Sequence, residues 1–149
     1  MKGIIGLILT MVVIVMGIFN GGHLINFVDV PSVIVVLFIT IGSLLIAHVS
    51  IPTMLKAVLS AQLTVEELRH AARGWGRAKT YIIGAGWIGF LVGIMNIAQF
   101  PKLSDQVDAL GPGIATATVT LFYAIVWAYA VFLPLQSRLE ARIEKQSGQ

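Results

Sequence analysis

Four long stretches of the chain carry no charged side chain, and this pattern constrains the fold more than any other feature of the sequence. They cover residues 3–20, 31–50, 81–100 and 113–135. A helix rises about 1.5 Å per residue, so about 20 residues cross the roughly 30 Å hydrocarbon core of a bilayer. Only 11% of the chain is charged, whereas soluble domains are roughly 25% charged. We therefore expect an all-α membrane protein with four transmembrane helices, residues 1–149 forming a single membrane domain.

Continuous apolar runs favour helices over the strands of a membrane β-barrel, whose segments are shorter and alternate in polarity. The first 20 residues could instead be a secretory signal peptide, with Lys2 as its charged region. They lack the small-residue pattern of a cleavage site, so a first membrane span is the favoured interpretation.

The basic residues lie on one side of the predicted spans. Nine of the ten Lys and Arg residues precede the first span, lie in the loop of residues 51–80, or follow the fourth span, and only Lys102 lies elsewhere. Because Lys and Arg accumulate in cytoplasmic loops, we expect both termini and residues 51–80 in the cytoplasm. The chain would then be a multi-pass protein of the bacterial inner membrane.

The cytoplasmic loop carries a helix start signal. Thr64 is followed three residues later by Glu67, which matches a capping box. We expect a short amphipathic helix at the membrane surface, with a basic face near anionic headgroups, although a basic anchor that only fixes orientation is the alternative. The apolar face would hold Leu63, Leu68, Ala71 and Ala72, and the basic face Arg69, Arg73, Arg77 and Lys79.

The sequence gives no support for an enzyme. No predicted span contains a carboxylate, and His23, His48 and His70 lie at span ends or in loops. Nucleophile–base pairs, metal-ligand spacings and phosphate loops are not found, so we expect no cofactor and no metal. A proton-coupled transporter that acts alone usually needs an ionisable group inside the membrane. If this chain conducts ions, a partner is expected to supply the titrating acid.

The third span has a face of small residues. Gly86, Gly89, Gly93 and Asn96 are spaced three or four residues apart and therefore share one side of a helix. Small residues in register allow membrane helices to approach closely. The face could be a packing seam inside one subunit, or it could contact another subunit or a partner helix, and both interpretations stay open.

The fourth span has a row of polar and small side chains at helical spacing, Thr116, Thr120, Ala124 and Trp127. A Thr in a membrane helix usually bonds to its own backbone four residues earlier, but this row is also a candidate ion lining. Pro134 near the inner end is expected to kink the helix, because proline removes one backbone hydrogen bond.

Three segments resemble one family of membrane proteins. The run GGHLINFVDVPSVIVVLFITIGSLLIA resembles the first outer loop and second helix of the flagellar stator subunits MotA and PomA. The run GWIGFLVGIMNIAQF is similar to the third span of TolQ and ExbB, with their G-x-x-G-x-x-x-G-I-M pattern. The run GPGIATATVTLFYAIVWAYAVFLPL resembles the fourth span. The chain is thus identified as a member of the MotA/TolQ/ExbB proton channel family.

The resemblance implies a homopentamer around two copies of a single-span partner of the MotB, TolR or ExbD type. That partner carries an essential Asp, and its protonation is coupled to rotation. The third and fourth spans would line the channel. The translocated ion is expected to be H⁺, with Na⁺ as the alternative.

The chain departs from the flagellar proteins in two respects. Only about thirty residues separate the second and third spans, so the large cytoplasmic domain is missing. Aligned without gaps, the family's channel Thr residues fall on Phe90 and on Leu121. We therefore expect Thr120 first and Thr116 second as polar channel contacts. Asn96, Phe90 and Leu121 are expected to line the ion path with them. Gly86, Gly89, Gly93, Ala124 and Trp127 are expected to pack helices or face the partner.

Three functions follow from these observations. The favoured one is the channel subunit of a stator-like motor that transduces an ion-motive force to a periplasmic or outer-membrane process. The alternative is a non-conducting membrane scaffold in an envelope complex. A small pore-forming protein or lone transporter is the third.

Overall fold

The computed structural model describes residues 2–21, 27–60, 62–99 and 107–148. Within these ranges the regular structure is helical, with no strand, so the expected all-α class is confirmed. The elements are α1 (Lys2–Gly21), α2 (Val30–Ile46), α3 (Ile51–Leu59), α4 (Val65–Ala98), α5 (Val107–Val126), the π-helix η3 (Trp127–Phe132) and α6 (Leu133–Ser147).

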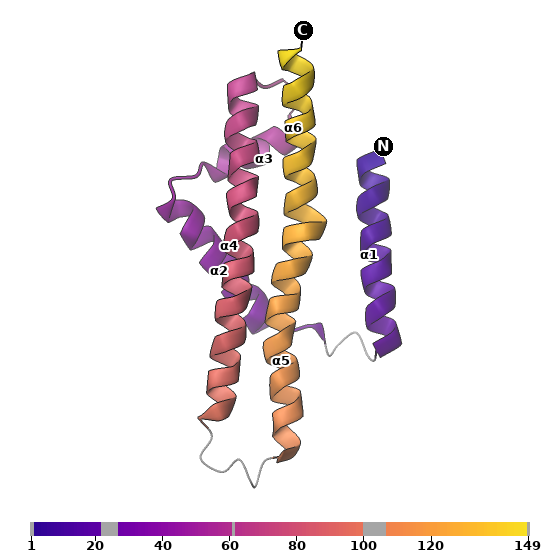
Figure 1. Ribbon diagram of the computed structural model, residues 1–149, viewed down its shortest axis with the longest axis vertical. Coiled ribbons are helices and arrows are strands. Elements are labelled where there is room, and N and C mark those ends of the chain that lie inside the picture. Colours follow the sequence, from indigo (N-terminus) through magenta and orange to yellow (C-terminus); the bar gives the residue numbers. More distant parts are fainter. Residues whose placement is uncertain (1, 22–26, 61, 100–106, 149) are drawn as a thin grey trace.

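Two long antiparallel helices form the axis of the molecule (Figure 1). One is α4, and the other is the continuous run of α5, η3 and α6. The first residues of α4 and the last of α6 lie at the same end, beside α3, while α2 runs obliquely across the pair and α1 stands on the other side (Figure 1). Both α2 and α3 pack against this pair, whereas α1 contacts it mainly at η3. The candidate site lies on the pair.

Two helices are long and apolar enough to span a membrane, Val65–Ala98 and Gly111–Ser147. The pair α2 and α3 passes the same test only if both are counted as one span, and they are bent by 107°. A shorter apolar helix covers Ile8–Phe19. The described residues thus belong to a membrane protein with two or three candidate spans. Four crossings with both ends in the cytoplasm stay a prediction.

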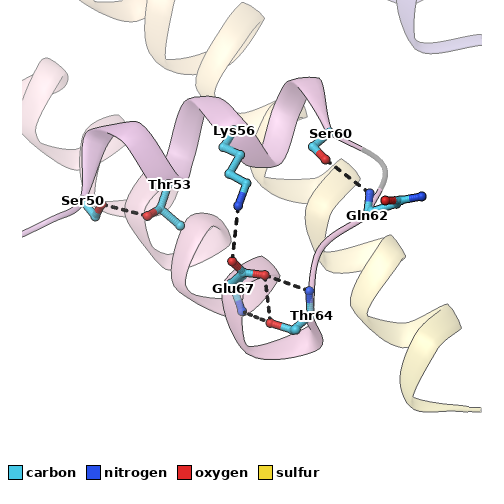
Figure 2. Close-up of polar contacts among 7 residues, drawn as sticks. All are labelled: Ser50, Thr53, Lys56, Ser60, Gln62, Thr64 and Glu67. Atoms are coloured by element: carbon cyan, nitrogen blue, oxygen red, sulfur yellow. Dashed lines mark hydrogen bonds and ion pairs between the residues drawn. The ribbon is translucent and has the colours of Figure 1, made fainter.

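The helix predicted to begin at Thr64 does so, and its capping box is formed. The Thr64 hydroxyl accepts from the Glu67 backbone N–H at 3.2 Å, and the Glu67 carboxylate accepts from the Thr64 backbone N–H at 3.0 Å (Figure 2). The helix is not short, however. It continues without a break into the predicted third span and ends at Ala98, because no proline interrupts residues 65–98.

The apolar face of this first helical part packs on protein. Leu68 and Ala71 are fully buried, together with Leu139 of α6 and Met54 of α3. The structure therefore corrects the expectation of a surface helix whose apolar side lies in the bilayer. We call this cluster the basal core, and its buried members are Leu44, Met54, Ala57, Leu63, Leu68, Ala71, Ala72, Trp75, Ala78 and Leu139.

The second predicted span is shorter than expected, and a further helix follows it. Pro31 lies in the first turn of α2, and Asp29 caps it by accepting from the Ser32 backbone N–H at 3.0 Å. The helix ends at Ile46 rather than at residue 50. His48 then adopts φ 51°, a left-handed conformation that is uncommon outside glycine. This residue lies in the bend between α2 and α3.

The charged tail after Leu135 continues the fourth predicted span as a helix, α6, as expected. Pro134 lies in the first turn of α6, directly after the π-helix η3. Proline leaves the carbonyl four residues earlier without a backbone donor, and π-turns are a common way to accommodate such a gap. Residues 111–147 run as one continuous helix without a break at Pro134. A kink at Pro134 therefore stays a prediction.

Candidate functional site

The glycines of α4 form a packing seam with α5. A Cβ added to Gly89 would lie 2.5 Å from Thr120 Cγ2, and one added to Gly93 would lie 2.7 Å from Ala117 Cβ. At Gly86 the added carbon would collide with Ala124 Cβ. Only glycine permits these backbones to approach so closely. The seam therefore lies inside the subunit, which is one of the two interpretations that the sequence left open.

Thr120 is held by α2. Its hydroxyl lies 2.6 Å from the Ser32 hydroxyl, and both residues are only 5% exposed. Buried hydroxyls need a hydrogen-bond partner, and here each supplies the other. The residue expected as the first channel contact is therefore engaged in a contact between helices of one chain.

A second polar contact fixes the start of α2 against α5. The Tyr123 hydroxyl accepts from the Asp29 backbone N–H at 3.0 Å and donates to the Phe27 carbonyl. Sequence reasoning did not single out Ser32, Asp29 or Tyr123. Asp29, two residues before Pro31, carried a local signal for a helix cap. Ser32 and Thr120 are 88 residues apart, so no local signal could have paired them.

A cleft of about 590 Å³ lies between α2, α4 and α5. Three of the predicted channel residues, Asn96, Thr116 and Thr120, meet there, together with Asp29 and Ser32. The Thr116 hydroxyl is also exposed and donates to the Pro112 carbonyl at 3.0 Å. Among the described residues, no group of three or more His, Cys, Asp or Glu could hold a metal ion.

Phe90 and Leu121 do not line this cleft. The Cβ position of Gly89 lies 3.4 Å from Val35 of α2, and Phe90 is turned about 100° further round α4. Likewise Thr120 faces α2, and Leu121 is turned about 100° away from it. The two positions where the family's channel Thr residues fall therefore lie on the side of the seam away from α2. Both are half-buried, and Leu121 Cδ1 lies 3.4 Å from the Cβ position of Gly86.

We call this side away from α2 the open face. Trp87 and Phe90 of α4 belong to it, with ring centroids 5.9 Å apart, and Trp87 is 50% exposed. On α5, Thr118 and Ile125 share a helix face with Leu121. The exposed Thr118 hydroxyl donates to the Ile114 carbonyl at 2.8 Å. Among the residues named here, the open face is apolar apart from the Thr118 hydroxyl, and residues 81–98 and 113–135 carry no charge.

The remaining predicted site residues lie along α5 and η3. Ala124 is fully buried against Gly86, as the seam requires. Trp127 is 39% exposed, and its ring centroid lies 6.1 Å from that of Phe132. Apart from Trp127 and Pro134, the predicted site residues lie in the seam, in the cleft beside α2, or on the open face. Gly89, Gly93 and Thr120 belong to both the seam and the cleft.

Comparison with known proteins finds similar sequences. Residues 40–149 match the model of the MotA/TolQ/ExbB proton channel family. The uncharacterized protein YtxD of Bacillus subtilis (strain 168) is 30% identical over 94 residues, which cover 62% of this chain and 34% of that protein. The chain thus spans about a third of the length of this curated relative.

Proposed function

The chain belongs to the MotA/TolQ/ExbB proton channel family, and on this premise we propose that it is the channel-forming subunit of an ion-driven, stator-like motor. It would act in the bacterial inner membrane as a homopentamer around a dimer of a single-span partner that carries an essential Asp. The translocated ion would be H⁺, with Na⁺ as the alternative. The output would go to a periplasmic or outer-membrane process.

The open face is the observation that carries this proposal. It lies on α4 and α5, away from the side that α2 covers, and it holds both family channel positions, Phe90 and Leu121. Five such faces turned inward would give an uncharged wall around the partner's helices. An acid supplied by the partner would then be the carboxyl group at that depth, because residues 81–98 and 113–135 contain no Asp or Glu.

The geometry changes which hydroxyl we assign to the channel. Thr120 faces α2 and bonds to Ser32, so Thr118 is the hydroxyl that the open face offers. The Thr118 hydroxyl donates its proton to the Ile114 carbonyl, and its oxygen lone pairs stay free to accept a hydrogen bond. Thr118 could therefore accept a hydrogen bond from a hydronium ion or from the partner's protonated Asp.

One observation favours the alternative of a non-conducting scaffold. Phe90 and Leu121 are apolar at the two positions where the family has Thr. A face with one hydroxyl per subunit offers fewer polar contacts to an ion, and the same apolar surface could serve assembly alone.

Ion flux separates the two functions. The chain would be co-expressed with a single-span partner that carries one Asp near the start of its span, and both would be reconstituted together in vesicles under a proton gradient. A motor subunit conducts, and the partner's Asp→Asn variant stops conduction. A complex that assembles fully but conducts no H⁺ or Na⁺ would support the scaffold instead.

A further inference from the structure

A second cleft, of about 510 Å³, lies at the bend between α2 and α3, away from the open face. We call it the basic cleft. Its polar lining comes from the bend, from α3 and from the first half of α4, and includes His48, Ser50, Thr53, His70, Arg73 and Arg77.

The fold builds this cleft through specific local features. His48 takes a left-handed backbone conformation, φ 51°, which costs energy in a residue other than glycine. Arg77 Nη1 donates to the Ala47 carbonyl at 3.5 Å and ties α4 to the end of α2. Gly74, also in the lining, has no side chain, and a Cβ there would lie 2.7 Å from Met54 of α3. These features together bring α3 against α4 with basic groups on the concave side.

The charge of the cleft is positive. Glu67 is the acid in its lining, but it already pairs with Lys56 at 3.7 Å and with the Thr64 cap (Figure 2). Hydrogen bonds from the Thr64 backbone and side chain, and then the charge of Lys56, hold the pKa of Glu67 below its usual value. Glu67 therefore stays ionised and is engaged by Lys56 and Thr64, so it does not pair with Arg73 or Arg77.

Both arginines donate to a backbone carbonyl, Arg73 Nε to that of Arg69 at 3.4 Å and Arg77 to that of Ala47. Arg73 also lies 3.6 Å from the Glu66 carboxylate, which contacts His70 at 3.2 Å. All three side chains are about two-thirds exposed, and such surface pairs contribute little. The partner found for Arg77 among the described residues is a backbone carbonyl rather than a carboxylate. An arginine guanidinium has five N–H donors and suits phosphate oxygens.

Neutral donors lie beside these charges. The Ser50 and Thr53 hydroxyls are 2.8 Å apart at the start of α3 (Figure 2). One of the two hydroxyls donates to the other, and Ser50 makes no side-chain cap to α3, so one O–H remains to donate to a ligand in the cleft. Two guanidinium groups and this hydroxyl are donors that suit a phosphate group.

Exposed apolar side chains lie on both helices that meet at the bend. Leu45 and Ile46, at the end of α2, are 60% and 82% exposed, and Leu55 and Leu59 of α3 are 53% and 87% exposed. A free phosphate ion would gain nothing from this surface, whereas acyl chains would. The combination of a basic cleft with an apolar margin favours an amphiphilic ligand.

We propose that the basic cleft binds the phosphate of an anionic phospholipid from the cytoplasmic leaflet, with the acyl chains along the exposed end of α2. This inference relies on the membrane placement in the proposed function, but not on ion conduction. A bound lipid at this position would hold the bend between α2 and α3 and thereby fix α3 against α4.

Lipid retention tests the proposal. The full chain, with its partner if the two purify together, would be solubilised in mild detergent and titrated with phosphatidylglycerol or phosphatidylcholine. Native mass spectrometry would then count the lipid molecules bound to each subunit. We expect a tightly retained phosphatidylglycerol per subunit and little phosphatidylcholine. Arg77→Gln should weaken retention about tenfold, and Arg73→Gln by a similar factor, because each removes a charged hydrogen bond to phosphate. The control Arg138→Gln, an exposed α6 position outside the cleft, should leave retention within about twofold.

Competition with a soluble anion identifies the source of the phosphate. Inorganic phosphate at millimolar concentration should not displace the phospholipid. If it does, the cleft is a site for free phosphate and the lipid assignment is wrong. Equal retention of the two lipids by the wild-type chain would also overturn the proposal, and this measurement needs no variant to fold. Flux assays on the same samples report separately on the proposed channel function.

Discussion

The hydroxyls of Ser32 and Thr120 lie 2.6 Å apart in a buried contact between α2 and α5. This contact joins the second predicted span to the α4–α5 pair and places Thr120 on the side of the seam that α2 covers. It therefore separates a polar residue that packs the subunit, Thr120, from the hydroxyl on the open face, Thr118.

Thr120→Val keeps the side-chain shape but leaves the buried Ser32 hydroxyl without its partner. We expect the variant to lose about 1–3 kcal/mol of unfolding free energy, the cost of an unsatisfied buried group. Adding Ser32→Ala should recover part of that loss. Denaturant unfolding in mild detergent provides the double-mutant cycle, and purely additive losses would show that the two hydroxyls do not interact.

Gly86→Ala places a methyl group against Ala124 Cβ, which is fixed to the backbone and cannot rotate away. The expected destabilisation is about 1–3 kcal/mol, typical of overpacking. Gly84 is the matched control, because a Cβ there meets nothing within 4 Å. Gly84→Ala should be neutral or stabilising by about 1 kcal/mol, since alanine has a higher helix propensity than glycine. Equal effects at the two glycines would argue against the seam.

Thr118→Val tests the open face. The residue is exposed in the subunit, so the unfolding free energy of the subunit should change by less than about 0.5 kcal/mol. Proton flux through the complex with its partner should nevertheless fall, because the channel wall loses its hydroxyl. Thr120→Val should reduce flux less at matched amounts of folded complex. The reverse order would assign the channel contact to Thr120, as the sequence alone suggested.

The capping box makes stability depend on pH. The folded-state pKa of Glu67 is lowered by hydrogen bonds from Thr64 and by Lys56. Its stabilising contribution is therefore present above the unfolded-state pKa of Glu67 and is lost as pH falls through the lower folded-state pKa. Glu67→Gln should remove this part of the acid dependence between neutral pH and the folded-state pKa. Thr64→Ala should cost about 1 kcal/mol as a lost helix cap.

Much of the fold could be predicted because its signals are local. The Thr64–Glu67 cap and the glycine spacing of α4 are readable from neighbouring residues, and both appear in the structure. The continuity of α4 has no such signal, because the change from basic to apolar composition near residue 80 predicts a boundary between helices. The bend at His48 was missed because a left-handed histidine has no sequence signal comparable to that of glycine.

The candidate site was harder to predict because it depends on contacts between distant segments. The spacing of Thr116 and Thr120 correctly placed them on one helix face, and both line the cleft with Asn96. Which side of α5 meets α2 is decided by Ser32 and Tyr123, in contacts that span about 90 residues. Without that information the polar face looks like the channel, although the structure turns it toward α2.

Disulfide cross-linking tests the central claim, that the open face lines a channel around the partner. The chain has no natural cysteine, so any disulfide that this chain forms must involve the introduced cysteine. Leu121→Cys on the open face would be oxidised together with a cysteine introduced near the partner's Asp. Val35→Cys, on α2 beside the Gly89 side of the seam, is the matched control. The account predicts a cross-linked chain–partner product with Leu121→Cys and none with Val35→Cys. Cross-linking from Val35→Cys but not from Leu121→Cys would contradict it.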